Sequence, residues 1–172
     1  KPDPLVPKKL IRGVSERVDC FGEVVVELNE DQAREAITSL RDAGCESIAI
    51  CFLWSFLRPE HELRVKEIAQ ELAPDLYVTC STELAPKWGE YERTTAVALN
   101  AYVGPTTVGY VTRLDTQLTE MGYKPPLQIN QCAGGTSSVY TAQEAPPLTP
   151  DSSPDSGVTG PADYGGRLRV PN

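Results

Sequence analysis

The chain has 172 residues, of which 40% are hydrophobic and 23% are charged, a composition typical of a globular domain. Its formal net charge of −8 and the lack of a dense Lys/Arg cluster argue against a groove for phosphate backbones, so we expect no nucleic-acid partner. No apolar run approaches the roughly 20 residues that span a bilayer, so we expect no membrane partner and a cytoplasmic protein.

The first half of the chain is predicted to alternate strands and helices. Residues 14–28 suggest a β-hairpin. Asn29, three residues before Gln32, is a capping arrangement, and apolar residues then recur at helical spacing until Gly44 ends the first helix. Residues 47–54 form an unbroken apolar run, which is typical of a central parallel strand covered on both faces.

The next elements continue this alternation. Pro59 is placed to open a second helix, whose apolar stripe continues until Pro74, and residues 76–80 read as another strand. Alternating elements with short connections imply an α/β fold with a mostly parallel sheet and flanking helices.

The second half begins with a pattern for two helices. One extends to Tyr102 and the other spans 106–121, with Gly104-Pro105 marking the break between them and Gly122 ending the second. A short apolar strand at 127–131 follows, and the chain beyond it has no clear periodicity.

The polar run at residues 90–93 has two readings. Acidic side chains are favourable at a helix start because of the helix dipole, so Glu90, Glu92 and Arg93 can form a charged first turn with a structural ion pair. Alternatively, Glu92 or Arg93 lies at a ligand cleft or a domain interface. The spacing of the residues does not separate the two.

Other candidate motifs are weaker. Residues 134–138, a glycine pair with three hydroxyl side chains, could hold an anion or form an ordinary tight turn. His61-Glu62 is half of a zinc-protease motif, but Val65 stands where the second histidine belongs, so we expect a solvent-facing first turn. Cys132 has no histidine nearby to activate it, and we expect an inert thiol.

The five cysteines are widely spaced, with no C-x-x-C pair and a single histidine in the chain. This pattern argues against a zinc site or a disulfide scaffold, so we expect no metal ligands and free thiols in a reducing compartment.

A series of sequence blocks in register gives the chain a family resemblance. They include the run Glu-Tyr-Glu-Arg-Thr and the final Gln-Cys-Ala-Gly-Gly, and they lie at residues 5–7, 16–19, 22–24, 49–55, 59–62, 90–94, 99–105 and 131–135. From Pro2 to about Ala145 the chain resembles the hydantoinase A / 5-oxoprolinase family. Within the family, the runs at residues 88–93 and 155–160 are most similar to the hydantoinase-A-like subunit of acetone and acetophenone carboxylases.

The resemblance implies an actin/sugar-kinase-like ATPase fold that uses ATP with Mg²⁺ to activate an amide or enolate oxygen by phosphorylation. It also implies a multi-subunit complex with a carboxylase or hydantoinase B-type subunit, and a ketone or cyclic amide as substrate. Positioning and charge neutralisation would carry such a phosphoryl transfer.

The resemblance also places Gly134, Gly135 and Ser152 on the nucleotide side, with Glu92 and Arg93 as cleft or interface candidates. The chain departs from the family pattern of an apolar residue followed by Asp-Ser-Gly-Pro, because Pro150 replaces the apolar residue and Ser153 the glycine. If that turn needs a positive φ, Ser153 costs stability there.

We expect the chain to be a piece of a larger protein. Residues 1–145 would form an incomplete α/β region of the hydantoinase/oxoprolinase type, and 146–172 a Pro/Ser/Gly-rich tail leading into a hydantoinase A domain that this chain does not contain. The leading hypothesis is the ATP-dependent subunit of an acetone-type carboxylase, inactive as this piece alone. The alternatives are an ATP-dependent cyclic-amide hydrolase, such as 5-oxoprolinase or N-methylhydantoinase, and a non-catalytic assembly module.

Overall fold

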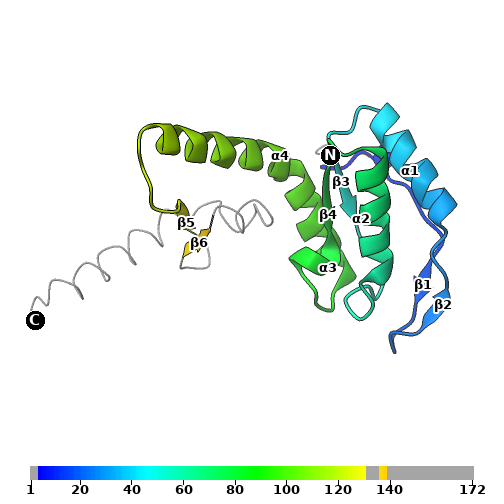
Figure 1. Ribbon diagram of the computed structural model, residues 1–172. Coiled ribbons are helices and arrows are strands. Elements are labelled where there is room, and N and C mark those ends of the chain that lie inside the picture. Colours follow the sequence, from blue (N-terminus) through cyan, green and yellow to red (C-terminus); the bar gives the residue numbers. More distant parts are fainter. Residues whose placement is uncertain (1–3, 131–135, 139–172) are drawn as a thin grey trace, which may run out of the picture. The chain divides into compact units, whose positions relative to one another are not determined.

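The computed structural model describes residues 4–130 and 136–138, and the chain divides after Pro105 into two compact units. The first unit contains the 3₁₀ helix η1 (Lys8–Leu10), strands β1 (Arg17–Val18) and β2 (Val24–Val26), helix α1 (Glu30–Asp42), strand β3 (Ser47–Ile50), helix α2 (Glu60–Leu72), strand β4 (Tyr77–Cys80) and helix α3 (Ser81–Leu84). Helix α4 (Glu90–Glu120) begins in the first unit and ends in the second, which also contains strands β5 (Gln128–Asn130) and β6 (Thr136–Ser138). Figure 1 shows these elements along the chain.

The first two sequence predictions are confirmed. Strands β1 and β2 pair antiparallel as a hairpin, with a register shift between Arg17 and Val18. Helix α1 starts where the capping pattern places it, because the Asn29 side chain accepts a hydrogen bond of 3.0 Å from the backbone N–H of Gln32. Gly44 follows the helix with a φ of +81°, a backbone conformation that glycine adopts without steric cost.

The parallel part of the sheet is smaller than predicted. Strands β3 and β4 pair in parallel around helix α2, as a βαβ unit, from Ser47 opposite Tyr77 to Ile50 opposite Cys80. Among the described residues, however, the β1–β2 and β5–β6 pairs are antiparallel and each sheet has two strands, so the fold is α/β but the expected mostly parallel sheet is wrong. Strand β3 stops early because the N–H of Phe52 donates to a side chain, the Glu62 carboxylate, and not to a neighbouring strand.

The core lies between the β3–β4 pair and helices α1 and α2, which contact each other along their length (Figure 1). Ile48 and Ile50 point into it from one face of β3, while Ala49 between them is exposed. Full burial of each large aliphatic side chain contributes roughly 1.5–3 kcal/mol. The buried cluster consists of Ala33, Ile37, Ile48, Ile50, Val65, Ile68, Ala69 and Cys80.

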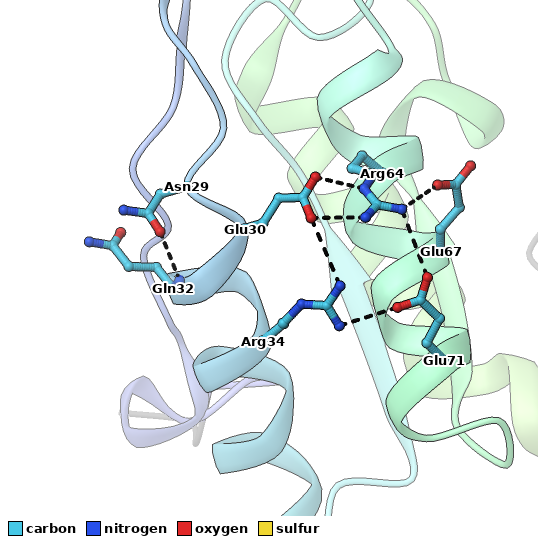
Figure 2. Close-up of polar contacts among 7 residues, drawn as sticks. All are labelled: Asn29, Glu30, Gln32, Arg34, Arg64, Glu67 and Glu71. Atoms are coloured by element: carbon cyan, nitrogen blue, oxygen red, sulfur yellow. Dashed lines mark hydrogen bonds and ion pairs between the residues drawn. The ribbon is translucent and has the colours of Figure 1, made fainter.

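An ionic network aligns α1 with α2 at their surface (Figure 2). Arg64 donates from Nε and from one terminal nitrogen to the two oxygens of Glu30, each at 2.8 Å, and Arg34 lies 3.2 Å from Glu71. The Arg64 hydrogen bond holds the pKa of Glu30 below its usual value. These side chains are solvent-exposed, so the network adds little stability and mainly sets how the two helices face each other.

The predicted break at Gly104-Pro105 is wrong, because α4 continues through Pro105 as one helix. Tertiary contacts hold it there. Asn100 donates to the Thr79 hydroxyl at 2.8 Å and to the Tyr77 hydroxyl at 3.2 Å, and the Tyr77 ring occupies the space that a Cβ on Gly104 would need. Gly104 therefore allows α4 to approach β4 closely, and it does not end a helix.

The second unit agrees with the sequence at two points. Gly122, with a φ of +88°, follows the end of α4, and its N–H donates to the carbonyl of Thr119 at 3.0 Å. The strand predicted at 127–131 is present as β5, which pairs antiparallel with β6. None of the helices in the described part of the chain combines the length and the hydropathy that a membrane crossing requires.

We predict opposite effects for two alanine substitutions in α4. Gly104→Ala should lower the free energy of unfolding by about 1–3 kcal/mol, because the new methyl group meets the Tyr77 ring, whose hydroxyl is held by Asn100. Gly109→Ala has open space around it and should raise that free energy by up to about 1 kcal/mol through helix propensity. Urea denaturation of both variants measures the difference, and equal stability would contradict the packing role of Gly104.

Candidate functional site

Buried polar side chains gather where the parallel strands β3 and β4 end, at the first turns of α2, α3 and α4. The carboxyl ends of parallel strands are where α/β sheets usually place ligands. Most side chains of this polarity lie at protein surfaces, so a group of them in the interior calls for a specific role. The group, named the strand-end cluster below, consists of Ser55, Glu62, Ser81, Thr82 and Arg93, none more than 8% exposed.

Glu62 lies at the centre of the strand-end cluster. Its Oε1 accepts hydrogen bonds from the Phe52 N–H at 2.8 Å, the Ser55 hydroxyl at 2.7 Å and the Ser81 hydroxyl at 2.7 Å, and its Oε2 accepts one from the Thr82 N–H at 3.0 Å. Oε1 accepts three of these bonds and Oε2 accepts one, so both oxygens of the buried carboxylate have donors from the chain. One side chain of α2 therefore joins the exit of β3 to the junction of β4 and α3.

The expectation of a solvent-facing turn at His61-Glu62 is wrong. Glu62 is fully buried, and His61 Nδ1 lies 2.9 Å from a carboxylate oxygen of Glu16, on the segment that leads into β1. Nothing in the local sequence separates this helix start from an exposed one. The signal that could have found Glu62 is the pair of serines, Ser55 and Ser81, at the exits of consecutive predicted strands.

Arg93 enters the cluster from the first turn of α4. One terminal nitrogen donates to the Ser55 hydroxyl at 2.7 Å, the other donates to the Phe52 carbonyl at 2.6 Å, and the guanidinium carbon lies 5.4 Å from the centre of the Phe56 ring. The acceptors of Arg93 among the described residues are neutral groups. The Ser55 hydroxyl bonds to both Arg93 and Glu62, so it links the guanidinium to the carboxylate. Within the same residues the Nε of Arg93 has no hydrogen-bond partner.

Glu92, the other candidate on this turn, points elsewhere. Its side chain is exposed and its Oε2 lies 2.7 Å from where a Cβ on Gly89 would stand. The structure thus brings Arg93 to the strand ends and leaves Glu92 outside the strand-end cluster. A cleft or interface role for the two residues stays a prediction.

The loop after β3 carries local backbone strain. Trp54 has a φ of +57°, which a large L-residue adopts only at a cost of roughly 1–2 kcal/mol. Its neighbours are tied down on both sides, since the backbone of Phe52 bonds to Glu62 and Arg93 and the hydroxyl of Ser55 bonds to the same two side chains. Such conformations persist where the surroundings over-determine them, and they cluster at functional sites.

A cavity of about 420 Å³ lies beside the strand-end cluster, along β3. Its walls are mostly apolar and come from residues 5–14, α1, β3 and the first three turns of α4. Its polar features include the Cys51 thiol and the Thr94 hydroxyl, which lie 3.2 Å apart. The volume falls in the range of small-molecule pockets.

The structure describes only part of the predicted anion loop and none of the nucleotide-side candidates. The nucleotide-side candidates Gly134, Gly135 and Ser152, together with Cys132, lie outside the described residues. Residues 136–138, the hydroxyl part of the predicted anion loop, form strand β6.

The buried thiol of Cys80 lies at the end of β4. Burial raises the pKa of this thiol well above its usual range, and the neighbouring carboxylates raise it further, so the thiol is unreactive.

Comparison with known proteins places this geometry in a family. The model of the hydantoinase/oxoprolinase N-terminal region matches residues 2–73, and the hydantoinase/oxoprolinase model matches residues 93–171. The chain belongs to the hydantoinase/oxoprolinase family. The two matched regions meet around the strand-end cluster, since Glu62 lies in the first and Arg93 is the first residue of the second.

Individual relatives cover the whole chain but are much longer. The acetophenone carboxylase gamma subunit of Aromatoleum aromaticum is 32% identical over 100% of this chain and 24% of its own length. A nucleotide-free acetone carboxylase structure superposes with a TM-score of 0.82 and 34% identity, over 97% of this chain and 24% of that one. The ATP-dependent caprolactamase of Pseudomonas jessenii superposes with a TM-score of 0.81 and 30% identity, over 95% and 24%. The chain therefore spans about a quarter of the length of these relatives.

We predict that Glu62→Gln lowers the free energy of unfolding by about 2–4 kcal/mol, because one amide oxygen replaces two carboxylate oxygens and an amide N–H₂ faces buried donors. Glu60→Gln, two residues earlier on an exposed side chain, is the matched control and should change it by less than about 0.5 kcal/mol. Guanidinium denaturation followed by circular dichroism measures both. Equal denaturation midpoints for the two variants would show that the four hydrogen bonds to Glu62 do not stabilise the ends of β3 and β4.

We predict that Arg93→Lys loosens the loop after β3 without unfolding the domain. Lysine keeps the charge but cannot bond two acceptors with a planar fork while stacking on the Phe56 ring. Limited chymotrypsin digestion should then cut at the half-exposed Leu53 or Leu57 several-fold faster than in the wild type. Arg58→Lys, whose guanidinium bonds the Gly22 carbonyl, is the control. Unchanged cleavage at the loop would refute the anchoring role.

Proposed function

We propose that this chain is part of the ATP-dependent subunit of a carboxylase of the acetone/acetophenone type, which activates a ketone oxygen by phosphorylation. The observation that carries the proposal is the match to an acetone carboxylase structure along 97% of the chain at 34% identity. The match to the acetophenone carboxylase gamma subunit, over the whole chain, also supports it. The parent protein would have an actin/sugar-kinase-like ATPase fold.

In this proposal the strand-end cluster forms one wall of the cleft. Glu62 and Arg93 hold the two strand ends at a fixed separation, which supplies positioning, the main protein contribution to phosphoryl transfer. ATP would supply the phosphoryl group and Mg²⁺ would neutralise its charge. Residues 4–130 and 136–138 contain no group of three His, Cys, Asp or Glu side chains that could hold a metal ion by themselves. We therefore assign the metal to none of them.

The nucleotide side of the cleft is assigned to Gly134, Gly135 and Ser152 by resemblance to the family, with Arg93 and Glu92 at its edge or at an interface. The proposed partner is a hydantoinase-B-type subunit. A cytoplasmic location suits the four described cysteines, all of which are free thiols. Because the chain is about a quarter as long as its relatives, we expect activity only from the parent protein.

A second candidate is an ATP-dependent cyclic-amide hydrolase. The caprolactamase structure superposes almost as well as acetone carboxylase, with TM-scores of 0.81 and 0.82. An amide oxygen and an enolate oxygen are alike as phosphoryl acceptors, so one cleft wall can serve both reactions. Within this class, 5-oxoproline, N-methylhydantoin and caprolactam are the substrates to test.

Product analysis of the full-length parent protein separates the two candidates. With its B-type subunit, ATP and Mg²⁺, the parent should incorporate labelled bicarbonate into an acid-stable product only when acetone or acetophenone is added. ATP consumption should depend on the same ketone. Opening of 5-oxoproline or caprolactam, measured by release of the free amino acid, or of N-methylhydantoin, measured by release of the N-carbamoyl amino acid, would favour the hydrolase and contradict the carboxylase.

A further inference from the structure

The cavity beside the strand-end cluster follows one edge of strand β3. Six consecutive residues, 47–52, line it, whereas none of the four residues of β4 does. Successive side chains of a strand point to opposite faces, so a cavity that touches six residues in a row reaches both faces of β3. It can do so only around the edge of β3 that lies away from β4. This space is named the β3-edge slot below.

The backbone along this edge has no partner strand within residues 4–130 and 136–138, because β3 pairs there with β4 alone. The Glu46 carbonyl accepts a hydrogen bond of 3.2 Å from the Tyr77 N–H at the start of β4. Since the backbone groups of a strand point to alternate edges, those of Ala49 and Cys51 face the slot. A free edge of this kind is a template for pairing with another strand.

Helices cover the slot on both sides. Helix α1 covers the face that carries Ile48 and Ile50, since its Ile37 lies in the same core cluster and also lines the slot. Helix α4 covers the opposite face, where the Cys51 thiol lies 3.2 Å from the Thr94 hydroxyl. Strands of α/β sheets are buried between such helix layers. The position beside β3 is therefore built like the position of a further strand.

The polar groups of the slot argue against a small molecule as its occupant, although the volume would suit one. A ligand site normally has a few polar side chains that fix the orientation of the ligand. Here the Cys51 thiol and the Thr94 hydroxyl bond to each other, and the Arg12 guanidinium bonds to Ser39. The polar groups left along β3 are backbone groups spaced to pair with a strand.

The relatives offer enough additional chain to supply that strand. This chain covers 24% of the acetophenone carboxylase gamma subunit and 24% of the acetone carboxylase chain, so about three quarters of each lies outside the matched region. A segment of the same protein is held close to the slot by the chain itself. Its effective concentration there is higher than that of a second copy in solution.

We infer that a short apolar strand from another part of the parent protein fills the β3-edge slot and pairs with the free edge of β3. It would span about six residues, roughly 20 Å, along the stretch of β3 that lines the slot. Because it is buried between two helices, it would consist mainly of Val, Ile and Leu. One of its ends would lie beside the exit of β3 and join the strand-end cluster in the cleft wall. Only this last step rests on the proposed function.

Hydrogen exchange in the wild-type full-length parent protein tests the pairing without any substitution. The amides of Ile48 and Ile50, which face β4, are the internal control and should exchange slowly. Those of Ala49 and Cys51 should exchange within about tenfold of the control rate, because the inserted strand accepts their hydrogen bonds. Mass spectrometry with fragmentation to single residues measures all four rates.

Three results of this measurement would overturn the inference. Exchange of the Ala49 and Cys51 amides more than about tenfold faster than the control would show a free edge. Slow exchange that is lost when the parent is diluted to a monomer would make the occupant a second copy. Slow exchange that requires added acetophenone would make the slot a ligand pocket.

Ala98→Phe in the full-length parent gives a second test. Ala98 lines the slot from α4, so the added ring would meet the inserted strand and lower the melting temperature by several degrees. Ala43→Phe makes the same change at an exposed alanine outside the slot and should shift the melting temperature by less than about 2 °C. If Ala98→Phe melts no lower than this control, the ring has entered an open cavity and the inference is wrong.

Failure of this inference and failure of the proposed function give different results. Fast exchange at Ala49 and Cys51 refutes the inserted strand, whichever reaction the parent catalyses. A parent that shows slow exchange there but consumes ATP with neither a ketone nor a cyclic amide retains the strand and refutes the function.

Discussion

Four hydrogen bonds to the Glu62 carboxylate hold together the part of the fold that the rest depends on. A charge taken out of water without compensation is strongly unfavourable. Here two backbone N–H groups and two hydroxyls replace the lost water, and the Arg93 guanidinium lies one hydroxyl away. Because these donors come from the exit of β3 and the start of α3, one side chain of α2 fixes both strand ends at once.

The loop between β3 and α2 follows from this arrangement. A strand that continued past Ile50 would use the Phe52 N–H for sheet pairing, but the carboxylate accepts it and the chain turns. The turn places Trp54 at a positive φ, and its strain persists because Phe52 and Ser55 on either side are held by Glu62 and Arg93. The geometry of the strand end is therefore set by the cluster and not by the strand.

The sequence predicts correctly those helices and strands that are determined by residues within or next to them. The Asn29 cap and the apolar stripe define α1 within a few residues, and the hairpin and α2 were found in the same way. Glu62 was misread because its partners lie 7 to 20 residues away and are joined to it only in the folded chain. The helix break at Gly104-Pro105 failed for a similar reason, since contacts with β4 override the low helix propensity of the pair.

Helix α4 is tied to both strand ends. Arg93 bonds to the exit of β3 and Asn100, two turns later, bonds to Thr79 of β4, so hydrogen bonds as well as apolar contacts fix the position of the helix. A helix segment this short is rigid compared with a loop. A displacement of these turns of α4 would therefore move Arg93 as well, so the packing of α4 on β4 helps to fix the strand-end geometry.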